Sequence, residues 1–165
     1  MRRSQAKVIA IFGLAVLWSL VSVAQEKAIS TMSPQDVVAK AKELQGQSVT
    51  SAGVVEGVVK DGMSSRSFIL VLKGNLRCRM SFDEFETSGR KVELKKSKWN
   101  PDVALYLSTP KYYYGSGADQ LLLGRGDTVT VSGTVKLEMG KPVLNGATIT
   151  KTSNPRLRSA LQLWY

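Results

Sequence analysis

A strict alternation of apolar and polar residues between Thr128 and Glu138 constrains the fold more than any other feature of the sequence. Its apolar side chains recur at every second position: Val129, Val131, Val135 and Leu137. Because successive side chains of a strand point to opposite faces, the pattern predicts a long β-strand with one buried and one solvated face. Gly133 falls on the buried face, where a bend or a close backbone approach would require it.

Four other segments have the composition of β-strands, because they are rich in branched apolar residues and bounded by turns that contain glycine. They are residues 49–60, 68–72, 76–82 and 143–150. In segment 76–82 the apolar side chains share one face, so Arg77 and Arg79 are expected on the other face. The chain is therefore expected to be mainly β, with five strands.

A short helix is predicted ahead of the first strand. Ser33 has N-cap chemistry, Pro34 suits the first helical turn, and Asp36 is an acid near the helix start. Apolar residues then recur at helical spacing until Gly46 ends the segment. Since a helix of roughly three turns is marginal alone, its apolar side is expected to dock on another part of the protein.

The cysteine and histidine counts exclude several kinds of chemistry. One cysteine and no histidine leave no Ser-His or Cys-His catalysis, no histidine-bound zinc and no intrachain disulfide. Cys78 falls on the apolar face of its strand and is expected to be a buried free thiol. Asp83, Glu84 and Glu86 lack the spacing of a calcium loop and suit a helix N-terminus. We therefore expect a protein that is not an enzyme and that uses no metal or cofactor.

Residues 1–24 have the pattern of a Sec-type signal peptide, in which a basic start and an apolar run precede small residues. Cleavage is expected after Ala24, and residues 25–32 then form a polar linker. The apolar run is shorter than the ~20 residues of a membrane-spanning helix. The prediction is a periplasmic or secreted protein with no transmembrane segment after cleavage.

The chain is strongly basic, with 23 lysines and arginines against 13 acidic residues. Only three of the basic residues fall in the signal segment, so the mature chain stays basic. Such a charge favours anionic partners such as nucleic acid, acidic polysaccharide or lipid phosphates. The alternative is that the charge only keeps the protein soluble.

Three strands, an intervening segment and a closing hairpin are the order of elements in the OB-fold, a five-stranded Greek-key barrel. Matching stretches occur at residues 44–49, 53–55, 76–80, 123–135 and 143–149. On these stretches the chain resembles the bacterial exported OB-fold proteins of the tRNA-anticodon-binding-domain-like family. The resemblance covers residues 34–82 and 122–150 and implies an OB-fold domain over residues 33–150 with a leading helix, without implying that tRNA is bound.

This chain departs from the family in two ways. Family members often carry a second cysteine where this chain has Ala147. The connection at residues 83–120 is also longer than usual, and is expected as a long insertion before the fourth strand.

The insertion holds a basic cluster at residues 90–98, which is followed by Trp99. Lys96, Lys98 and Trp99 together suit an anion-binding edge with an aromatic platform, as single-stranded nucleic acid or polysaccharide sites use. The same pattern is typical of an edge strand that lysines protect from aggregation. Further on, the middle one of three consecutive tyrosines is a candidate contact residue.

The expected function is that of an exported binding or assembly module that recognises an anionic polymer, nucleic acid or glycan, through a basic face. The alternative is a structural or protein-interaction subunit of a bacterial envelope complex. In OB-folds that bind polymers, the outer side of strands two and three and the adjacent loops form the site. The candidate ligand-binding residues are Arg66, Lys73, Arg77, Arg79, Lys96, Lys98, Trp99, Tyr113 and Lys141.

The C-terminal tail, residues 151–165, has apolar residues at positions 157, 160, 161 and 164, spaced like one face of a helix. Two interpretations remain open. The tail folds back onto the barrel, or it orders only on a partner.

Overall fold

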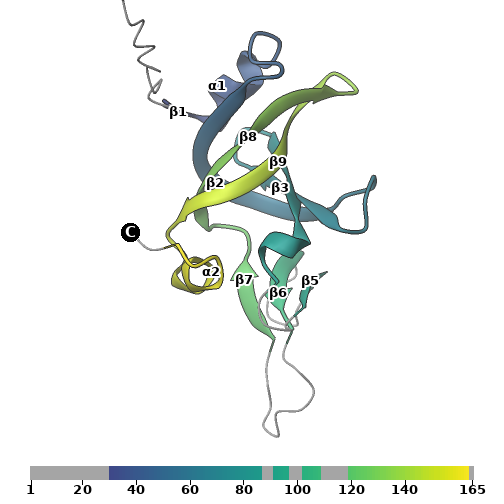
Figure 1. Ribbon diagram of the computed structural model, residues 1–165, viewed down its shortest axis with the longest axis vertical. Helices are drawn as coiled ribbons and strands as arrows, with labels where there is room; N and C mark the ends of the chain where they lie inside the picture. The colour runs from purple at the N-terminus through teal and green to yellow at the C-terminus, as the bar shows by residue number, and fades with distance from the viewer. Residues whose placement is uncertain (1–29, 87–90, 97–101, 109–118, 164–165) are drawn as a thin grey trace, which may run out of the picture.

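The computed structural model describes residues 30–86, 91–96, 102–108 and 119–163 (Figure 1). The predicted signal segment at 1–24 lies outside these residues, as do residues 25–29 of the linker. No helix in the described ranges is long and apolar enough to cross a membrane.

Five strands form a closed barrel. They are β2 (Ser48–Lys60), β3 (Ser67–Leu72), β4 (Leu76–Ser81), β8 (Thr128–Glu138) and β9 (Lys141–Thr152). The pairing runs β2-β3-β4-β9-β8, and β8 pairs back onto β2 to close the barrel. β4 and β9 are parallel, and the other four pairings are antiparallel. The expectations of a mainly β chain and a five-stranded barrel are confirmed.

The alternation in β8 has the predicted consequence. Val129, Val131 and Val135 are buried in the core, while the polar residues between them, Thr130, Ser132 and Thr134, are partly exposed. Gly133 is also buried, and a Cβ at this position would lie 3.1 Å from the Cα of Ala147 on β9. Glycine therefore suits this position, where a Cβ would crowd the backbone of the neighbouring strand.

The N-terminal end of the barrel carries β1 (Thr31–Met32), which pairs in parallel with β2, and α1 (Pro34–Ala39). The Ser33 hydroxyl accepts a hydrogen bond from the Asp36 N–H at 3.1 Å, as an N-cap does. The helix is shorter than the sequence predicts, since it ends at Ala39 and not near Gly46. The N–H of Gly46 donates instead to the Val135 carbonyl at 2.8 Å, which ties the rest of the segment to β8.

The insertion and the three residues that follow it form a second, smaller sheet. After η1 (Phe82–Glu84), its strands are β5 (Val92–Lys95), β6 (Ala104–Leu107) and β7 (Gln120–Leu123), paired in the order β5-β6-β7. Leu105, Leu107 and Leu123 are buried in one core with the barrel residues. In Figure 1 this sheet lies at the end of the barrel opposite α1. The insertion therefore closes one end of the barrel.

The tail folds back onto its own domain. Its helix α2 (Pro155–Ala160) contacts β7 and β9, and Leu157 is fully buried in the common core. The Asn154 side chain caps the helix and donates to the Leu122 carbonyl at 2.9 Å. Of the two interpretations of the tail, the structure shows the first for residues 151–163; Trp164 and Tyr165 lie outside the described residues.

Candidate functional site

The outer side of β4 and the strands beside it carries most of the candidate residues. Leu76, Cys78 and Met80 are buried, whereas Arg77 and Arg79 lie between them and are partly exposed. The two arginines thus point outward, as the strand pattern predicts. Their surroundings make them very different from each other.

Arg79 is the centre of an ion-pair cluster. Its Nε donates to Asp61 Oδ2 at 2.8 Å, and its Nη2 donates to Glu138 Oε2 at 2.8 Å. A second bond to Glu138 comes from Nη1, which also donates to Asn145 at 3.2 Å. Only 18% of the Arg79 side chain and 3% of the Asp61 side chain are exposed. Arg79 therefore ties the turn after β2 to the end of β8.

The protonation equilibria in this cluster reflect the same contacts. Burial alone raises the pKa of Asp61, but the hydrogen bonds that the carboxylate accepts outweigh burial. Those donors are the Ser67 hydroxyl, the Met63 N–H and Arg79, and they leave the pKa of Asp61 below its ordinary value. The hydrogen bonds from Arg79 likewise hold the pKa of Glu138 below its ordinary value. All three groups are charged at neutral pH. The remaining N–H of Arg79 Nη2 points to Met63 Sδ at 3.4 Å, so no pair of N–H groups is free to bind a ligand carboxylate or phosphate.

Arg66 is also paired, although in solvent. Its Nη2 lies 3.0 Å from Asp83 Oδ1, and 78% of the Arg66 side chain is exposed. An exposed pair of this kind contributes little to stability, so Arg66 can exchange Asp83 for another anion at small cost.

Four of the cations that form no ion pair with a described residue lie on or beside β4, β8 and β9. They are Lys73, Arg77, Lys136 and Lys141. The register places Arg77 beside Val143 on β9, and Val143 beside Lys136 on β8. We call these four side chains the basic row.

Strand order brings the rest of the basic row to the same end of the barrel. Because β4 and β9 are parallel and Arg77 is level with Val143, the turn before β4 is level with the start of β9. Lys73 lies in that turn, and Lys141 is the first residue of β9. Val143 is buried on the outer side of the sheet, between Arg77 and Lys136.

Lys136 is the member of the basic row that the sequence analysis missed. The alternation in β8 places Lys136 on the outer face, but it places four hydroxyl residues there too, so the pattern does not single out Lys136. What distinguishes Lys136 is its register with Val143 and Arg77, which depends on how distant strands pair.

Of the candidates in the insertion, only Lys96 lies within the described residues, and it does not join the basic row. Lys96 is exposed and lines a cavity of about 260 Å³ with residues of β2, among them Glu56 and Val59. Lys98, Trp99 and Tyr113 lie outside the described residues. The other interpretation of the lysines, as protection of an edge strand, fits the position of β5 at the edge of its sheet.

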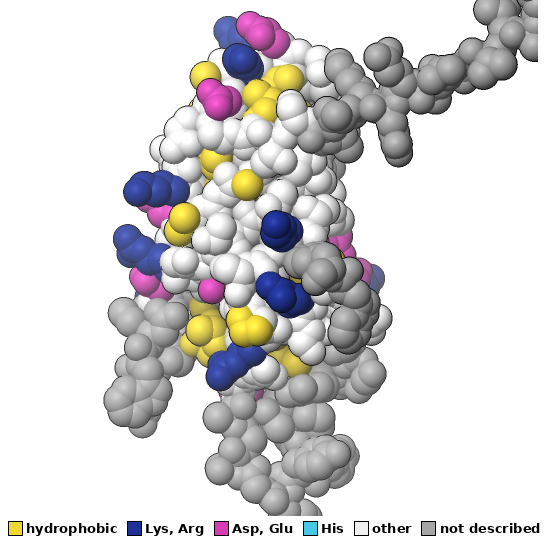
Figure 2. All heavy atoms as spheres, turned by 90° about the vertical axis from the view of Figure 1, so that its left-hand side faces the viewer, with side chains coloured by type: hydrophobic (Ala, Val, Ile, Leu, Met, Phe, Trp, Pro, Cys, Tyr) yellow, Lys and Arg dark blue, Asp and Glu magenta, His cyan; other side chains and the backbone are white. Residues whose placement is uncertain are grey.

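Figure 2 shows the face on the left-hand side of Figure 1. Lysine and arginine side chains are scattered on this face, and uncharged polar side chains and backbone cover its centre. A continuous basic surface is not present on this side.

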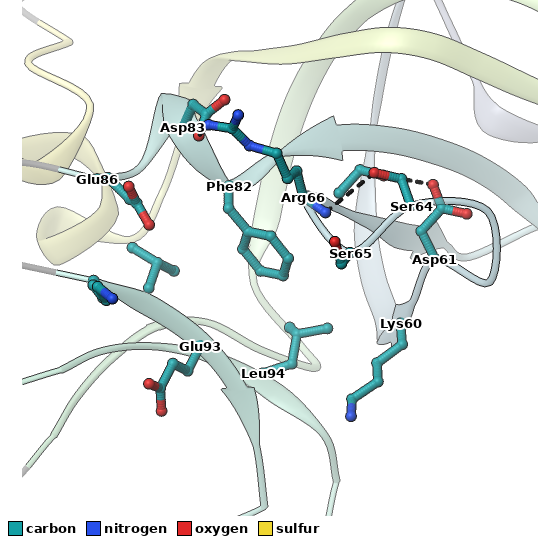
Figure 3. Close-up of a pocket in the computed structure, with 13 residues that line it drawn as sticks. Lys60, Asp61, Ser64, Ser65, Arg66, Phe82, Asp83, Glu86, Glu93 and Leu94 are labelled. Atoms are coloured by element: carbon teal, nitrogen blue, oxygen red, sulfur yellow. Dashed lines mark hydrogen bonds and ion pairs between the residues drawn. The ribbon is translucent and has the colours of Figure 1, made fainter.

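A larger cavity of about 640 Å³ lies between the barrel and the small sheet (Figure 3). Its lining includes Lys60, Arg66 and Phe82 from the barrel side and Val92, Glu93 and Leu94 from β5. The size is in the range of ligand clefts, and the lining combines apolar and charged groups of both signs.

Cys78 is fully buried and has no disulfide partner, which confirms the sequence prediction. Burial raises the pKa of its thiol to about 12. Because the thiolate is the reactive form, native protein is expected to react with a thiol reagent at least about a hundredfold more slowly than protein in denaturant. Ellman's reagent at pH 8, with and without guanidinium, measures the two rates; equal rates would contradict the burial of Cys78.

Among the described residues, no group of three or more cysteine, aspartate or glutamate side chains is arranged to hold a metal ion. In comparisons with known proteins, no protein-family model, curated protein or solved structure matches the chain.

Proposed function

We propose that the chain is an exported, non-enzymatic binding module with the OB-fold topology, which recognises an anionic polymer through the basic row. The strand order β2-β3-β4-β9-β8 with a parallel β4–β9 contact supports this topology. It is the order that five strands take when the third and fifth close a Greek-key barrel. Export rests on the signal-like residues 1–24 and the predicted cleavage after Ala24.

The observation that carries the proposal is the basic row itself. Arg77 and Lys136 flank Val143, Lys73 and Lys141 lie at the same end of the barrel, and none of the four forms an ion pair with a described residue. Arg77 is level with Lys136 across β9, so both charges can contact the same polymer of phosphate, sulfate or carboxylate groups. Arg79, by contrast, is neutralised within the protein and is not part of this proposed surface.

We expect the mature protein to bind a fluorescein-labelled single-stranded oligothymidylate or heparin with an affinity that falls steeply as salt rises. For a single strand the slope of log K against log salt is about −0.7 for each phosphate neutralised. The double variant Arg77→Ala, Lys136→Ala should bind about tenfold or more weakly at low salt and show a shallower slope. Fluorescence anisotropy over a salt series measures both quantities.

The matched control is the double variant Lys42→Ala, Arg156→Ala, which removes the same charge from exposed residues outside the basic row. Equal losses in the two double variants would mean that net charge alone attracts the polymer. Affinity that is independent of salt would favour the alternative, a protein-interaction subunit with a packed interface. Comparing the affinities for oligothymidylate and heparin shows whether the protein prefers nucleic acid or acidic glycan.

A further inference from the structure

The groove between the barrel and the small sheet has a sheet edge along one wall. Residues 91–94, at and beside β5, form one side of the 640 Å³ cavity. The turn that follows β2 and the start of η1 form the opposite side. In Figure 3 Phe82 and Leu94 point into the space between the two walls, while Glu93 points away from it.

The backbone of β5 is unpaired along this wall. In the described part of the chain β5 pairs only with β6, through the register Val92–Leu107 to Lys95–Ala104. The Ser108 N–H donates to the Lys91 carbonyl at 2.8 Å, so the backbone of Lys91 faces β6. In an antiparallel pair, the backbone N–H and C=O groups of successive residues point alternately toward and away from the partner strand. The N–H and C=O groups of Val92 and Leu94 therefore face away from β6.

An open edge of this kind is a template for an added strand. An extended peptide lying in the groove would accept from the N–H groups and donate to the C=O groups of Val92 and Leu94. Its apolar side chains would meet Phe82 and Leu94, which line the groove.

The other face of β5 specifies the charges of the peptide. Lys91, Glu93 and Lys95 alternate in sign on this face, and Lys91 and Glu93 are exposed. Lys95 is already paired with Asp119 and lies over the Tyr106 ring at 5.5 Å. Because opposite charges on directly paired strands attract and like charges repel, the best partner has acidic, basic and acidic residues at alternate positions.

The same charges disfavour a second copy of this chain. Two β5 strands paired antiparallel with Glu93 opposite Glu93 would also bring Lys91 opposite Lys95 of the other copy, and these contacts are repulsive. A register shifted by two residues places Glu93 opposite a lysine but leaves the third charge of the strand without an opposite partner. A chain with the full complementary pattern opposes all three charges and is therefore favoured over a second copy.

We infer that the groove binds an extended segment of another protein, with the pattern acidic–apolar–basic–apolar–acidic, which adds a fourth strand to the small sheet beside β5. The inference is independent of the basic row, because it uses a different surface and a peptide of balanced charge. A polymer that binds the basic row need not compete with it.

The test uses the mature protein and a fluorescein-labelled peptide with the core Glu-Val-Lys-Val-Glu. We expect saturable binding by fluorescence polarisation, about fivefold or more tighter than that of the charge-inverted peptide Lys-Val-Glu-Val-Lys. Hydrogen exchange of the Val92 and Leu94 amides, measured by NMR, should slow when the peptide binds. Equal binding of both peptides, or unchanged exchange at Val92 and Leu94 at saturation, would overturn the inference.

Two controls separate strand addition from contact by charge alone. N-methylation of the peptide amides that face β5 should abolish binding, whereas N-methylation of the alternate amides should leave it unchanged. The variant Glu93→Lys should reduce the preference for Glu-Val-Lys-Val-Glu, because its central lysine then meets a lysine; Glu43→Lys, the same change on an exposed residue near α1, should leave the preference unchanged. A preference that Glu43→Lys shifts as much as Glu93→Lys would place the peptide elsewhere.

Discussion

Replacing Leu157 with alanine is expected to lower the free energy of unfolding by about 3 kcal/mol, a typical loss for a fully buried leucine. The side chain is 0% exposed and belongs to the same core cluster as Leu122, Leu123 and the barrel valines. Truncation to alanine would leave a cavity where α2 meets β7, and neither element can move without disturbing the barrel. Urea denaturation of the mature protein measures the change.

Deletion of the chain after Asn154 is expected to cost at least as much, because it removes Leu157 and the partly buried Ala160, Leu161 and Leu163 together. Arg156→Ala is the matched control, since this residue is exposed on the same helix and should change stability by less than about 0.5 kcal/mol. An unfolding transition that Leu157→Ala leaves unchanged would mean that the tail does not complete the core.

The barrel strands could be predicted from the sequence because local patterns determine them. The alternation in residues 128–138 coincides with β8, and the segment at 49–60 differs from β2 by one residue at its start. The helix was predicted too long because apolar spacing continues to Leu44, although the backbone just beyond it, at Gly46 and Gln47, bonds to β8. A long-range hydrogen bond of this kind leaves no local signal.

The small sheet could not be predicted in the same way. Its strands β5, β6 and β7 have four residues each, too few to establish a period. β6 is buried at every position and so shows no alternation. The lysines of β5 were visible in the sequence, but their place at the edge of a second sheet depends on pairing with β6.

The candidate site also depends on long-range contacts that the local sequence does not reveal. The sequence assigns Arg77 and Arg79 to one outward face and gives no reason to separate them. The structure separates them by partners that are distant in sequence: Asp61 is 18 residues from Arg79, and Glu138 is 59 residues away. Only the closed barrel brings these three charges together, so residue type and strand face cannot tell a structural arginine from one available to a ligand.

Arg79→Ala is therefore expected to destabilise the protein and not simply to weaken a ligand. Without the guanidinium, the carboxylate of Asp61 stays buried at 3% exposure and loses its opposite charge. The expected loss is about 3 kcal/mol, at the low end for breaking a buried ion pair because Glu138 is 30% exposed. Arg66→Ala is the control, since it breaks an exposed pair that is worth at most about 1 kcal/mol.

The pH dependence of unfolding tests the same cluster independently. The contacts depress the pKa values of Asp61 and Glu138 in the folded state, so their stabilisation is fully present above the ordinary values of 3.8 and 4.5. It is then lost as the pH falls through the lower folded values, because the folded state must take up protons that the unfolded chain already holds. In Arg79→Ala this acid-dependent loss should become smaller, since burial then opposes the remaining hydrogen bonds to Asp61. Urea midpoints measured between pH 7 and pH 3 give both slopes, and parallel curves for the two proteins would refute the role assigned to Arg79.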